Sequence, residues 1–239
     1  MMISCLCPTY KRPTLLANAI ACFLQQDYDG PAELIVLDDA GELLPGESEP
    51  IPGRVVRILS TADRYPDLPS KFNKLSSISS GELLAVWEDD DIYLPWHLHT
   101  IATTHLDAPH AGLLAPRKAF STYGQPYGQV IIEEVSGRFH GAWAYVAAAF
   151  RSTGGYVKTP HLTFDQETGG RMSQQTGKYE YETPSYVYRC NHNQYRGSQV
   201  SGTGYLGHYD SLRALPAGRD LVIEPAIDDW TRRILEQLT

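Results

Sequence analysis

Short apolar runs alternate with stretches of helical periodicity through residues 1–106. The runs have the length of buried strands, and they lie at residues 3–7, 33–37, 55–59 and 83–87. Apolar side chains recur at helical spacing after Pro13, at residues 71–79 and after Pro95, and proline suits a first helical turn. Strands that alternate with helices predict an α/β protein with a parallel, Rossmann-like sheet.

The pattern changes after Leu106, where the alternation fades and Gly, Tyr, Thr and Gln become frequent. A strand is expected at residues 130–135, and residues 143–150 have the pattern of a buried strand or helix. Residues 227–238 carry an apolar stripe, which predicts a helix packed on its own domain. In the first half, residues 41–53 are rich in Gly, Pro and Glu and are expected to form a loop.

Length and charge limit the classes of protein to consider. A chain of 239 residues can bury one sizeable core, so a single domain is expected. Its 20 basic and 28 acidic residues give a net charge of −8, which argues against a non-specific grip on nucleic acid or an anionic membrane. The cysteines form no C-x-x-C pair. The N-terminus has no basic segment followed by a long apolar stretch, and the longest apolar run, residues 142–150, is too short to span a bilayer. We expect a soluble, cytoplasmic protein with free thiols and no transmembrane segment.

Four consecutive carboxylates, Glu88, Asp89, Asp90 and Asp91, follow the apolar run at residues 83–87. Adjacent carboxylates repel one another, so a cation or a paired base is needed to stabilise them at a strand end. Hard ions such as Mg²⁺ and Mn²⁺ favour oxygen ligands, and Mg²⁺ commonly combines one or two carboxylates with water and substrate phosphates. The run therefore indicates a site for a metal and a nucleoside diphosphate. A solvated acidic loop that caps the next helix is the alternative.

Polar residues follow three of the expected strands. They are residues 9–12 (Thr, Tyr, Lys and Arg), Asp38 with Asp39, and the acidic run. Ligands of open α/β sheets bind beyond the carboxyl ends of the strands, so these groups are expected to converge on one crevice. Asp38 and Asp39 could instead form a turn, but no helix follows for them to cap, which favours ligand contact. For Lys11 and Arg12, phosphate contact and ordinary solvated charge both stay open.

Six segments occur in a fixed order within about the first 100 residues: Pro8-Thr9-Tyr10-Lys11-Arg12-Pro13, Gln25-Gln26-Asp27-Tyr28, Glu33-Leu34-Ile35-Val36-Leu37-Asp38-Asp39, Asn73, Gly81-Glu82 and Glu88-Asp89-Asp90-Asp91-Ile92-Tyr93-Leu94-Pro95. Together they resemble the family 2 glycosyltransferases. The resemblance implies a GT-A-type fold, a Rossmann-like mixed, mainly parallel sheet flanked by helices in a single domain. It also implies a nucleotide-sugar-binding half at residues 1–106 and an acceptor-binding half, with the C-terminal helix, at residues 107–239.

The resemblance implies a set of donor contacts in the first half of the chain. Thr9 would lie by the nucleotide, Asp39 would bind the donor base and Asp89 would lie near the ribose. Lys11 stands where the family usually has Asn. The other expected donor contacts are Tyr10, Arg12, Arg64 and Lys71, of which the last two could reach the base or a phosphate.

Asp90 is the metal ligand that the resemblance implies, in a DXD-type motif for Mn²⁺ or Mg²⁺. Glu88 stands where many members have the first Asp, so either Glu88 or Asp89 could assist Asp90. Asp91 is a further candidate ligand. So is His192, because residues 184–192 resemble a terminal strand of the family followed by a His that faces the diphosphate. A lone His is more often a structural or surface group than a ligand.

A second acidic segment supplies the expected general base. Residues 161–167, with Arg171 downstream, resemble the family's acidic pair followed by a helix that carries Arg. Asp165 matches the second acid of that pair, and Phe164 replaces the usual Glu, which leaves Glu167 as a competing base. Before this segment, residues 151–156 resemble the family's turn back toward the active site, where glycines permit close backbone approach.

The resemblance therefore implies an inverting, metal-dependent glycosyltransferase that moves a sugar from a nucleoside diphosphate to an acceptor hydroxyl. The acceptor could be a saccharide, a lipid-linked group or a protein. A metal-dependent nucleotidyltransferase is one alternative, but it usually has a Gly/Arg/Lys-rich phosphate loop where this chain has residues 8–13. A non-catalytic nucleotide-sugar-binding module is the other, and it would need no base at position 165.

Overall fold

Strand β1 (Ile3–Thr9) is buried along its whole length. In the computed structural model, which describes residues 1–121, 131–157 and 163–189, it lies between the parallel strands β2 (Ala32–Asp38) and β5 (Leu83–Val86). Strands that are buried on both faces are typical of parallel sheets covered by helices. The carboxyl ends of β1, β2 and β5 meet at the same edge, which is where the polar residues of the expected site follow them.

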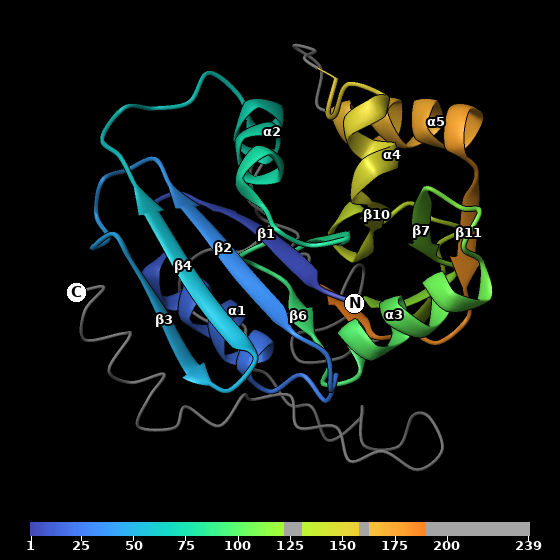
Figure 1. Cartoon of the computed structure of the whole chain (residues 1–239), viewed down its shortest axis with the longest axis horizontal. Coiled ribbons are helices and arrows are strands. Elements are labelled where there is room, and N and C mark those ends of the chain that lie inside the picture. Colours follow the sequence, from blue (N-terminus) through green and yellow to red (C-terminus); the bar gives the residue numbers. More distant parts are fainter. Residues whose placement is uncertain (122–130, 158–162, 190–239) are drawn as a thin grey trace.

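Strand β1 belongs to an eight-stranded sheet with the order β11-β7-β10-β5-β1-β2-β4-β3 (Figure 1). Parallel pairs join β1 to β2 and β5, β2 to β4, and β11 to β7, whereas β10 and β3 run antiparallel to their neighbours. The remaining strands are β3 (Gly46–Ile51), β4 (Arg54–Ser60), β7 (Leu113–Pro116), β10 (Ala144–Val146) and β11 (Lys178–Tyr181). The expected mixed, mainly parallel sheet in a single domain is confirmed.

Helices cover both faces of this sheet. Helices α1 (Pro13–Leu24) and α3 (His97–Asp107) share one hydrophobic core with Cys5 and Cys7 of β1. Helices α2 (Leu68–Ile78), α4 (Ala147–Ser152) and α5 (Phe164–Thr176) share the other core with Leu6. Successive side chains of a strand point to opposite faces, so this alternation follows directly from the strand conformation. Cys5, Cys7 and Cys22 are free thiols.

A smaller sheet brings the second half of the chain to the acidic run. Its order is β6-β12-β8-β9, formed by β6 (Ile92–Tyr93), β8 (Lys118–Ser121), β9 (Ile131–Glu134) and β12 (Tyr186–Tyr188). Strand β6 follows Asp91 directly and pairs antiparallel with β12. A short 3-10 helix, η1 (His140–Ala142), contacts β5 and β7. The acidic run is therefore a turn between the two sheets.

Two expectations about elements need correction. Residues 41–53 are not wholly a loop, because β3 lies within them and pairs with β4 at the edge of the sheet. An edge strand tolerates polar residues and a proline, and the register shifts between Ser48 and Ile51. The helix expected from Pro95 begins at His97 instead, because β6 ends at Tyr93 and the next residues form a turn, in which the His97 N–H donates to the Leu94 carbonyl.

The other expected elements of the second half are found where the structure describes them. The strand expected at residues 130–135 is β9, and residues 143–150 contain β10 followed by the start of α4. The predicted helix at residues 227–238 lies outside the described residues. Within the described ranges, no helix combines the length and apolar character needed to cross a bilayer.

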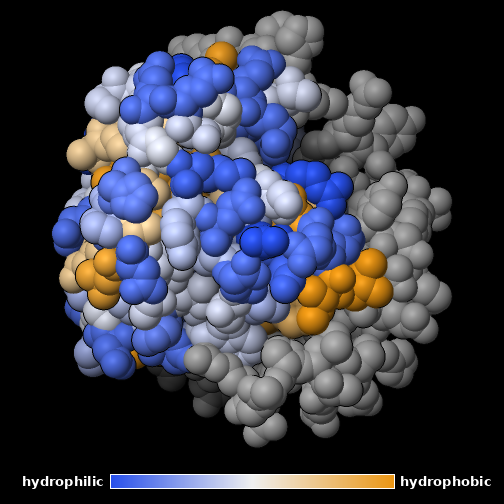
Figure 2. All heavy atoms as spheres, turned by 90° about the vertical axis from the view of Figure 1, so that its right-hand side faces the viewer, coloured by the Kyte–Doolittle hydropathy of each residue, from blue (hydrophilic) through white to orange (hydrophobic). Residues whose placement is uncertain are grey.

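Figure 2 shows the side of the molecule that carries α3, α5 and β11 in Figure 1. The coloured surface is largely hydrophilic, with small and separate hydrophobic patches. Large contiguous apolar patches mark docking surfaces. The described residues on this face form no such patch, whereas the polar residues of the expected site lie at the carboxyl ends of the strands.

Candidate active site

The acidic turn gathers carboxylate oxygens in a small volume. Atoms of Glu88, Asp90 and Asp91 all lie within 4.8 Å of one another. Asp89, Asp90 and Asp91 are 4%, 9% and 1% exposed, so water stabilises their charges poorly. Three oxygen donors this close fit a hard divalent ion. The roles of these residues as ligands stay predictions.

The end of β1 meets this turn, as the sequence predicts. Thr9 Oγ1 donates a hydrogen bond of 2.6 Å to Asp89 Oδ2, and Arg12 Nη1 lies 2.9 Å from both Asp89 Oδ1 and Asp90 Oδ2. Burial and the charge of Asp90 raise the pKa of Asp89 to about 6, against the opposing effect of Arg12. Thr9 and Arg12 therefore lie beside the carboxylates that the resemblance assigns to the ribose and the metal.

Asp91 is held by residues of the second half of the chain. Its Oδ1 accepts a hydrogen bond of 2.8 Å from the Arg189 backbone N–H, and its Oδ2 accepts one from the Tyr186 hydroxyl. The Arg189 guanidinium donates through Nε to the backbone carbonyl of Asp90, and its Nη2 is buried with no partner among the described residues. Burial raises the pKa of Asp91 well above its usual range. This geometry fits a residue that anchors the turn at least as well as it fits a metal ligand.

Glu88 belongs to a hydrogen-bonded chain that runs away from the turn. Its Oε1 lies 2.8 Å from Nδ1 of His140, and Nε2 of His140 lies 2.6 Å from the Tyr156 hydroxyl. The pKa of Glu88 is raised to about 8. Burial is the largest cause, and the charges of Asp90 and Asp165 add to it. Burial also lowers the pKa of His140 to about 4, so its imidazole is neutral near pH 7.

Asn73 fixes the far end of this chain. Its side-chain amide accepts a 2.7 Å hydrogen bond from the Tyr156 backbone N–H and donates one of 3.0 Å to the Tyr156 carbonyl. Gly155 has a φ of +71°, and a Cβ there would lie 2.4 Å from Asn73 Oδ1. The close approach expected for the glycine pair is therefore an approach to Asn73.

Asp39 lies at the centre of a second charged cluster. Its Oδ1 is 2.7 Å from Lys71 Nζ and 3.0 Å from Arg64 Nη1, and its Oδ2 accepts a 3.0 Å hydrogen bond from the Tyr65 N–H. The Arg64 guanidinium stacks 3.4 Å above the centre of the Tyr10 ring. All four predicted donor contacts in this cluster are therefore together, and the exposed Arg64 covers the buried Asp39.

Asp38 differs from its neighbour, and its predicted ligand contact is not supported. Its carboxylate accepts hydrogen bonds from the backbone N–H groups of Ala40, Glu42 and Leu43, at 2.8, 2.8 and 3.1 Å, and from the Ser60 hydroxyl at 2.8 Å. A short Asp side chain can close a turn without any helix to cap. Asp38 therefore shapes the backbone that presents Asp39.

Asp165 lies in the first turn of α5, half-buried, within electrostatic range of the acidic turn. Its charge contributes to the raised pKa values of Glu88 and Tyr156. Glu167 is exposed and accepts a 2.9 Å hydrogen bond from the Thr163 hydroxyl near the start of the same helix. This placement favours Asp165 over Glu167 as the candidate base. His192 lies outside the described residues, so its predicted role is untested.

Sequence reasoning did not find His140 or the role of Tyr186. His140 stands alone in a segment without a recognisable pattern, so only the folded chain brings it to Glu88. Tyr186 and Arg189 lie in the segment that resembles a terminal strand of the family, which was a usable signal for their place but not for their contacts.

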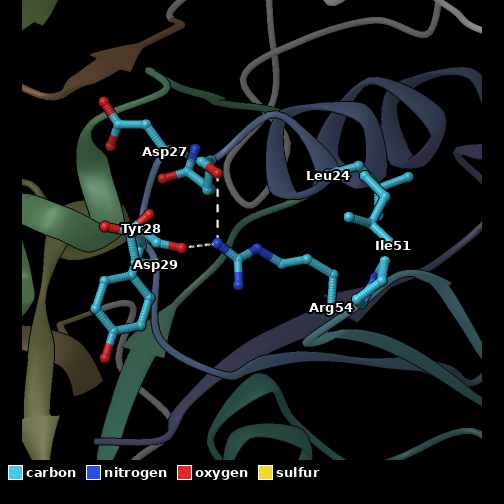
Figure 3. Close-up of a pocket in the computed structure, with 8 residues that line it drawn as sticks. Leu24, Asp27, Tyr28, Asp29, Ile51 and Arg54 are labelled. Carbon is cyan, nitrogen blue, oxygen red and sulfur yellow. Dashed lines mark hydrogen bonds between the residues drawn. The ribbon is translucent and has the colours of Figure 1, made fainter.

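A pocket lies near the amino-terminal ends of β2 and β4, away from the candidate site (Figure 3). Arg54 points from β4 into the loop after α1 and donates to the carbonyls of Gly30, Gly53 and Gln26 at 2.7, 3.2 and 3.4 Å, and to that of Tyr28. Its donors are directed at backbone carbonyls, so we interpret this pocket as a structural clamp on the loop.

The fold resembles solved structures, although no family model and no curated protein sequence matches the chain. S. aureus TarS 1-349 in complex with UDP-GlcNAc matches at 18% identity with a TM-score of 0.58, over 84% of this chain and 62% of that chain. The same protein in complex with UDP matches at 16% identity with a TM-score of 0.59, over 79% and 60%.

Mannosyltransferase PcManGT from Pyrobaculum calidifontis, in complex with GDP-Man and Mn²⁺, matches at 15% identity with a TM-score of 0.58, over 81% of this chain and 58% of that chain. This chain thus spans less than two thirds of the length of these structures. At such identities the likeness establishes the fold, and it agrees with the GT-A-type architecture expected from the sequence.

Proposed function

We propose that the chain transfers a sugar from a nucleoside diphosphate sugar to an acceptor hydroxyl, with inversion at the anomeric carbon and with help from a divalent metal ion. The observation that carries the proposal is the meeting of the acidic turn, the Asp39 cluster and Asp165 at one end of the sheet. The likeness of fold to structures that contain UDP-GlcNAc and GDP-Man gives further support.

The donor nucleotide would lie across the carboxyl ends of β1 and β2. Asp39 can accept an N–H from the base, and the stacked pair of Tyr10 and Arg64 can cover its face. Thr9 links this cluster to Asp89 of the acidic turn, and a ribose would be placed beside these two residues. Arg12 and Lys71 supply the positive charge that a diphosphate needs.

The residues present fit a divalent ion by the chemistry of their oxygen donors. Asp90 would hold it, together with Glu88 or Asp91, and Mn²⁺ or Mg²⁺ suits such a set. When bound, the ion neutralises negative charge on the departing diphosphate. The protein contributes the fixed position of these carboxylates, because His140 contacts Glu88 and the Arg189 backbone N–H donates to Asp91.

Asp165 is the proposed general base. It would accept the proton of the acceptor hydroxyl while the acceptor oxygen forms a bond to the anomeric carbon and the bond from that carbon to the diphosphate oxygen breaks. The acceptor attacks from the face opposite the leaving group, so one displacement inverts the configuration. We also propose that residues 107–239 form the half of the domain that binds the acceptor.

Product analysis with Mn²⁺ separates this proposal from the two alternatives. Incubation with UDP-GlcNAc, GDP-Man and other nucleotide sugars should release nucleoside diphosphate and free or transferred sugar. Release of pyrophosphate would support nucleotidyl transfer, and binding without any product would support a binding module.

Thermal stability of Asp90→Ala tests the metal site. This variant should lose the Mn²⁺-dependent thermal stabilisation by UDP or GDP, because a ligand raises the stability only of a folded state that binds it.

A further inference from the structure

Arg12 places one guanidinium nitrogen between two carboxylates of the acidic turn. Its Nη1 lies 2.9 Å from Asp89 Oδ1 and 2.9 Å from Asp90 Oδ2, and its side chain is 20% exposed. Asp90 is also the main metal ligand in the proposed function. One oxygen of that ligand therefore already faces a cation that belongs to the protein.

The other carboxylates of the turn are held by different groups. Asp91 accepts from the Tyr186 hydroxyl and the Arg189 backbone, and Glu88 is paired with the neutral His140. The Arg189 guanidinium donates to the backbone carbonyl of Asp90 and not to a carboxylate of the turn. Among the described residues, the ion pairs between an Arg or Lys side chain and this turn are those of Arg12.

We propose that Arg12 and a divalent ion compete for Asp90, and that the guanidinium leaves Asp90 Oδ2 when the metal binds. The inference rests on the proposed function, which supplies the metal. Two cations at one carboxylate oxygen repel each other strongly where water is largely excluded. Without the ion, Arg12 offsets the repulsion among the carboxylates. A donor diphosphate then offers the displaced guanidinium a new anionic partner.

Calorimetric titration of nucleotide-free protein with Mn²⁺ alone tests this competition. Arg12→Gln removes the resident cation, so Mn²⁺ should bind about 10-fold more tightly than to the parent, the effect of losing one close like charge. Without Mn²⁺, the same variant should melt at a lower temperature than the parent, and Mn²⁺ should raise its melting temperature by more.

Lys11→Gln is the matched control. Lys11 is the next residue in the chain, is exposed, and its ammonium lies 5.5 Å from the centre of the Tyr10 ring. The control changes the net charge by the same amount, so Mn²⁺ affinity should stay within about 2-fold of the parent if contact with Asp90, rather than long-range charge, is decisive. An equal gain in both variants overturns the proposal.

Addition of UDP or GDP tests the second half of the inference. In the parent, nucleotide should tighten Mn²⁺ binding, and Mn²⁺ should tighten nucleotide binding by the same factor. In Arg12→Gln this factor should shrink, because no guanidinium remains to move from Asp90 to the phosphates. An undiminished factor overturns the transfer of Arg12.

The remaining outcomes separate this inference from the proposed function. If the parent binds Mn²⁺ and releases nucleoside diphosphate, while Arg12→Gln binds Mn²⁺ equally or more weakly, only the competition is wrong. If neither protein binds Mn²⁺, the metal site and the competition both fail. If Arg12→Gln does not fold alone, Mn²⁺ should restore its circular dichroism spectrum, since the ion replaces the lost charge, and failure to do so overturns the proposal.

Discussion

Thr9 joins the two charged clusters of the candidate site. Its hydroxyl donates to Asp89 and its backbone carbonyl accepts a 2.6 Å hydrogen bond from Lys71, which also pairs with Asp39. A single residue at the end of β1 thus connects the proposed base-binding and metal-binding regions. Such coupling requires that Lys71 keep its charge while 6% exposed, although burial lowers its pKa.

The two cations on Asp39 should differ greatly in their effect on stability. The side chain of Lys71 is 7% exposed and that of Arg64 is 56% exposed. Lys71→Gln leaves a buried carboxylate poorly compensated and should lower the free energy of unfolding by about 3–5 kcal/mol. Arg64→Gln should cost less than about 1 kcal/mol, because solvent screens its pair. Urea unfolding of both variants measures the contrast, and equal losses would show that burial does not decide it.

His97 should make the fold sensitive to acid. It is fully buried, and burial lowers its pKa to about 3. The unfolded chain binds a proton on this imidazole below about pH 6.5, while the folded protein does not until about pH 3. Stability contributed by the neutral His97 is therefore lost as the pH falls from 6.5 toward 3, and the loss at pH 5 is about 2 kcal/mol.

Urea unfolding at pH 7 and pH 5 gives the size of this loss. His97→Gln should reduce the difference between the two pH values by about 2 kcal/mol, because its amide does not titrate. His99→Gln, on the exposed side of the same helix, is the control and should leave the difference unchanged. The same difference in His97→Gln and in the parent protein would contradict the assignment.

At the scale of elements, β12 stabilises the turn that carries the acidic residues. It pairs with β6 immediately after Asp91, and that carboxylate accepts hydrogen bonds from Tyr186, its first residue, and from Arg189, the residue after its end. The family resemblance implied this strand, and local apolar patterns predicted the strands and helices of the first half. The sequence could not predict β3 or the contacts of β12, since these depend on which strands become neighbours after folding.

Tyr186→Phe tests the anchoring by β12. The substitution keeps the ring but removes the hydroxyl that donates to the buried Asp91, so the free energy of unfolding should fall by about 1–3 kcal/mol. Tyr179→Phe makes the same chemical change on β11, where the side chain is 41% exposed, and should have little effect. Chemical denaturation compares them, and similar stabilities for both variants would remove Asp91 and Tyr186 as an anchor.

At the scale of the whole molecule, both halves of the chain build one site. The first half supplies the Asp39 cluster and the acidic turn, in segments whose spacing the sequence shows directly. The second half supplies His140, Tyr156, Arg189 and Asp165, which are scattered along the chain and come together only through the order β7-β10-β5 and the smaller sheet. This is why the sequence predicted the clusters of the first half more completely than the contacts that the second half makes with them.

The same division gives the last prediction, since the proposed transfer step needs a base from the second half beside a donor held by the first. Asp165→Asn keeps the shape of the side chain and removes its basicity, so donor and Mn²⁺ should bind nearly as before. Turnover should fall by about 10²–10⁴-fold, the usual contribution of a general base. Glu167→Gln is the control on the same helix. Because Glu167 is exposed and accepts a hydrogen bond from Thr163, the turnover of this variant should stay near that of the parent.

Steady-state rates on an acceptor, together with donor affinities from calorimetry, separate the Asp165→Asn and Glu167→Gln variants. If Glu167→Gln loses turnover while Asp165→Asn keeps it, the two roles must be exchanged, and if neither changes, the base lies elsewhere in the second half.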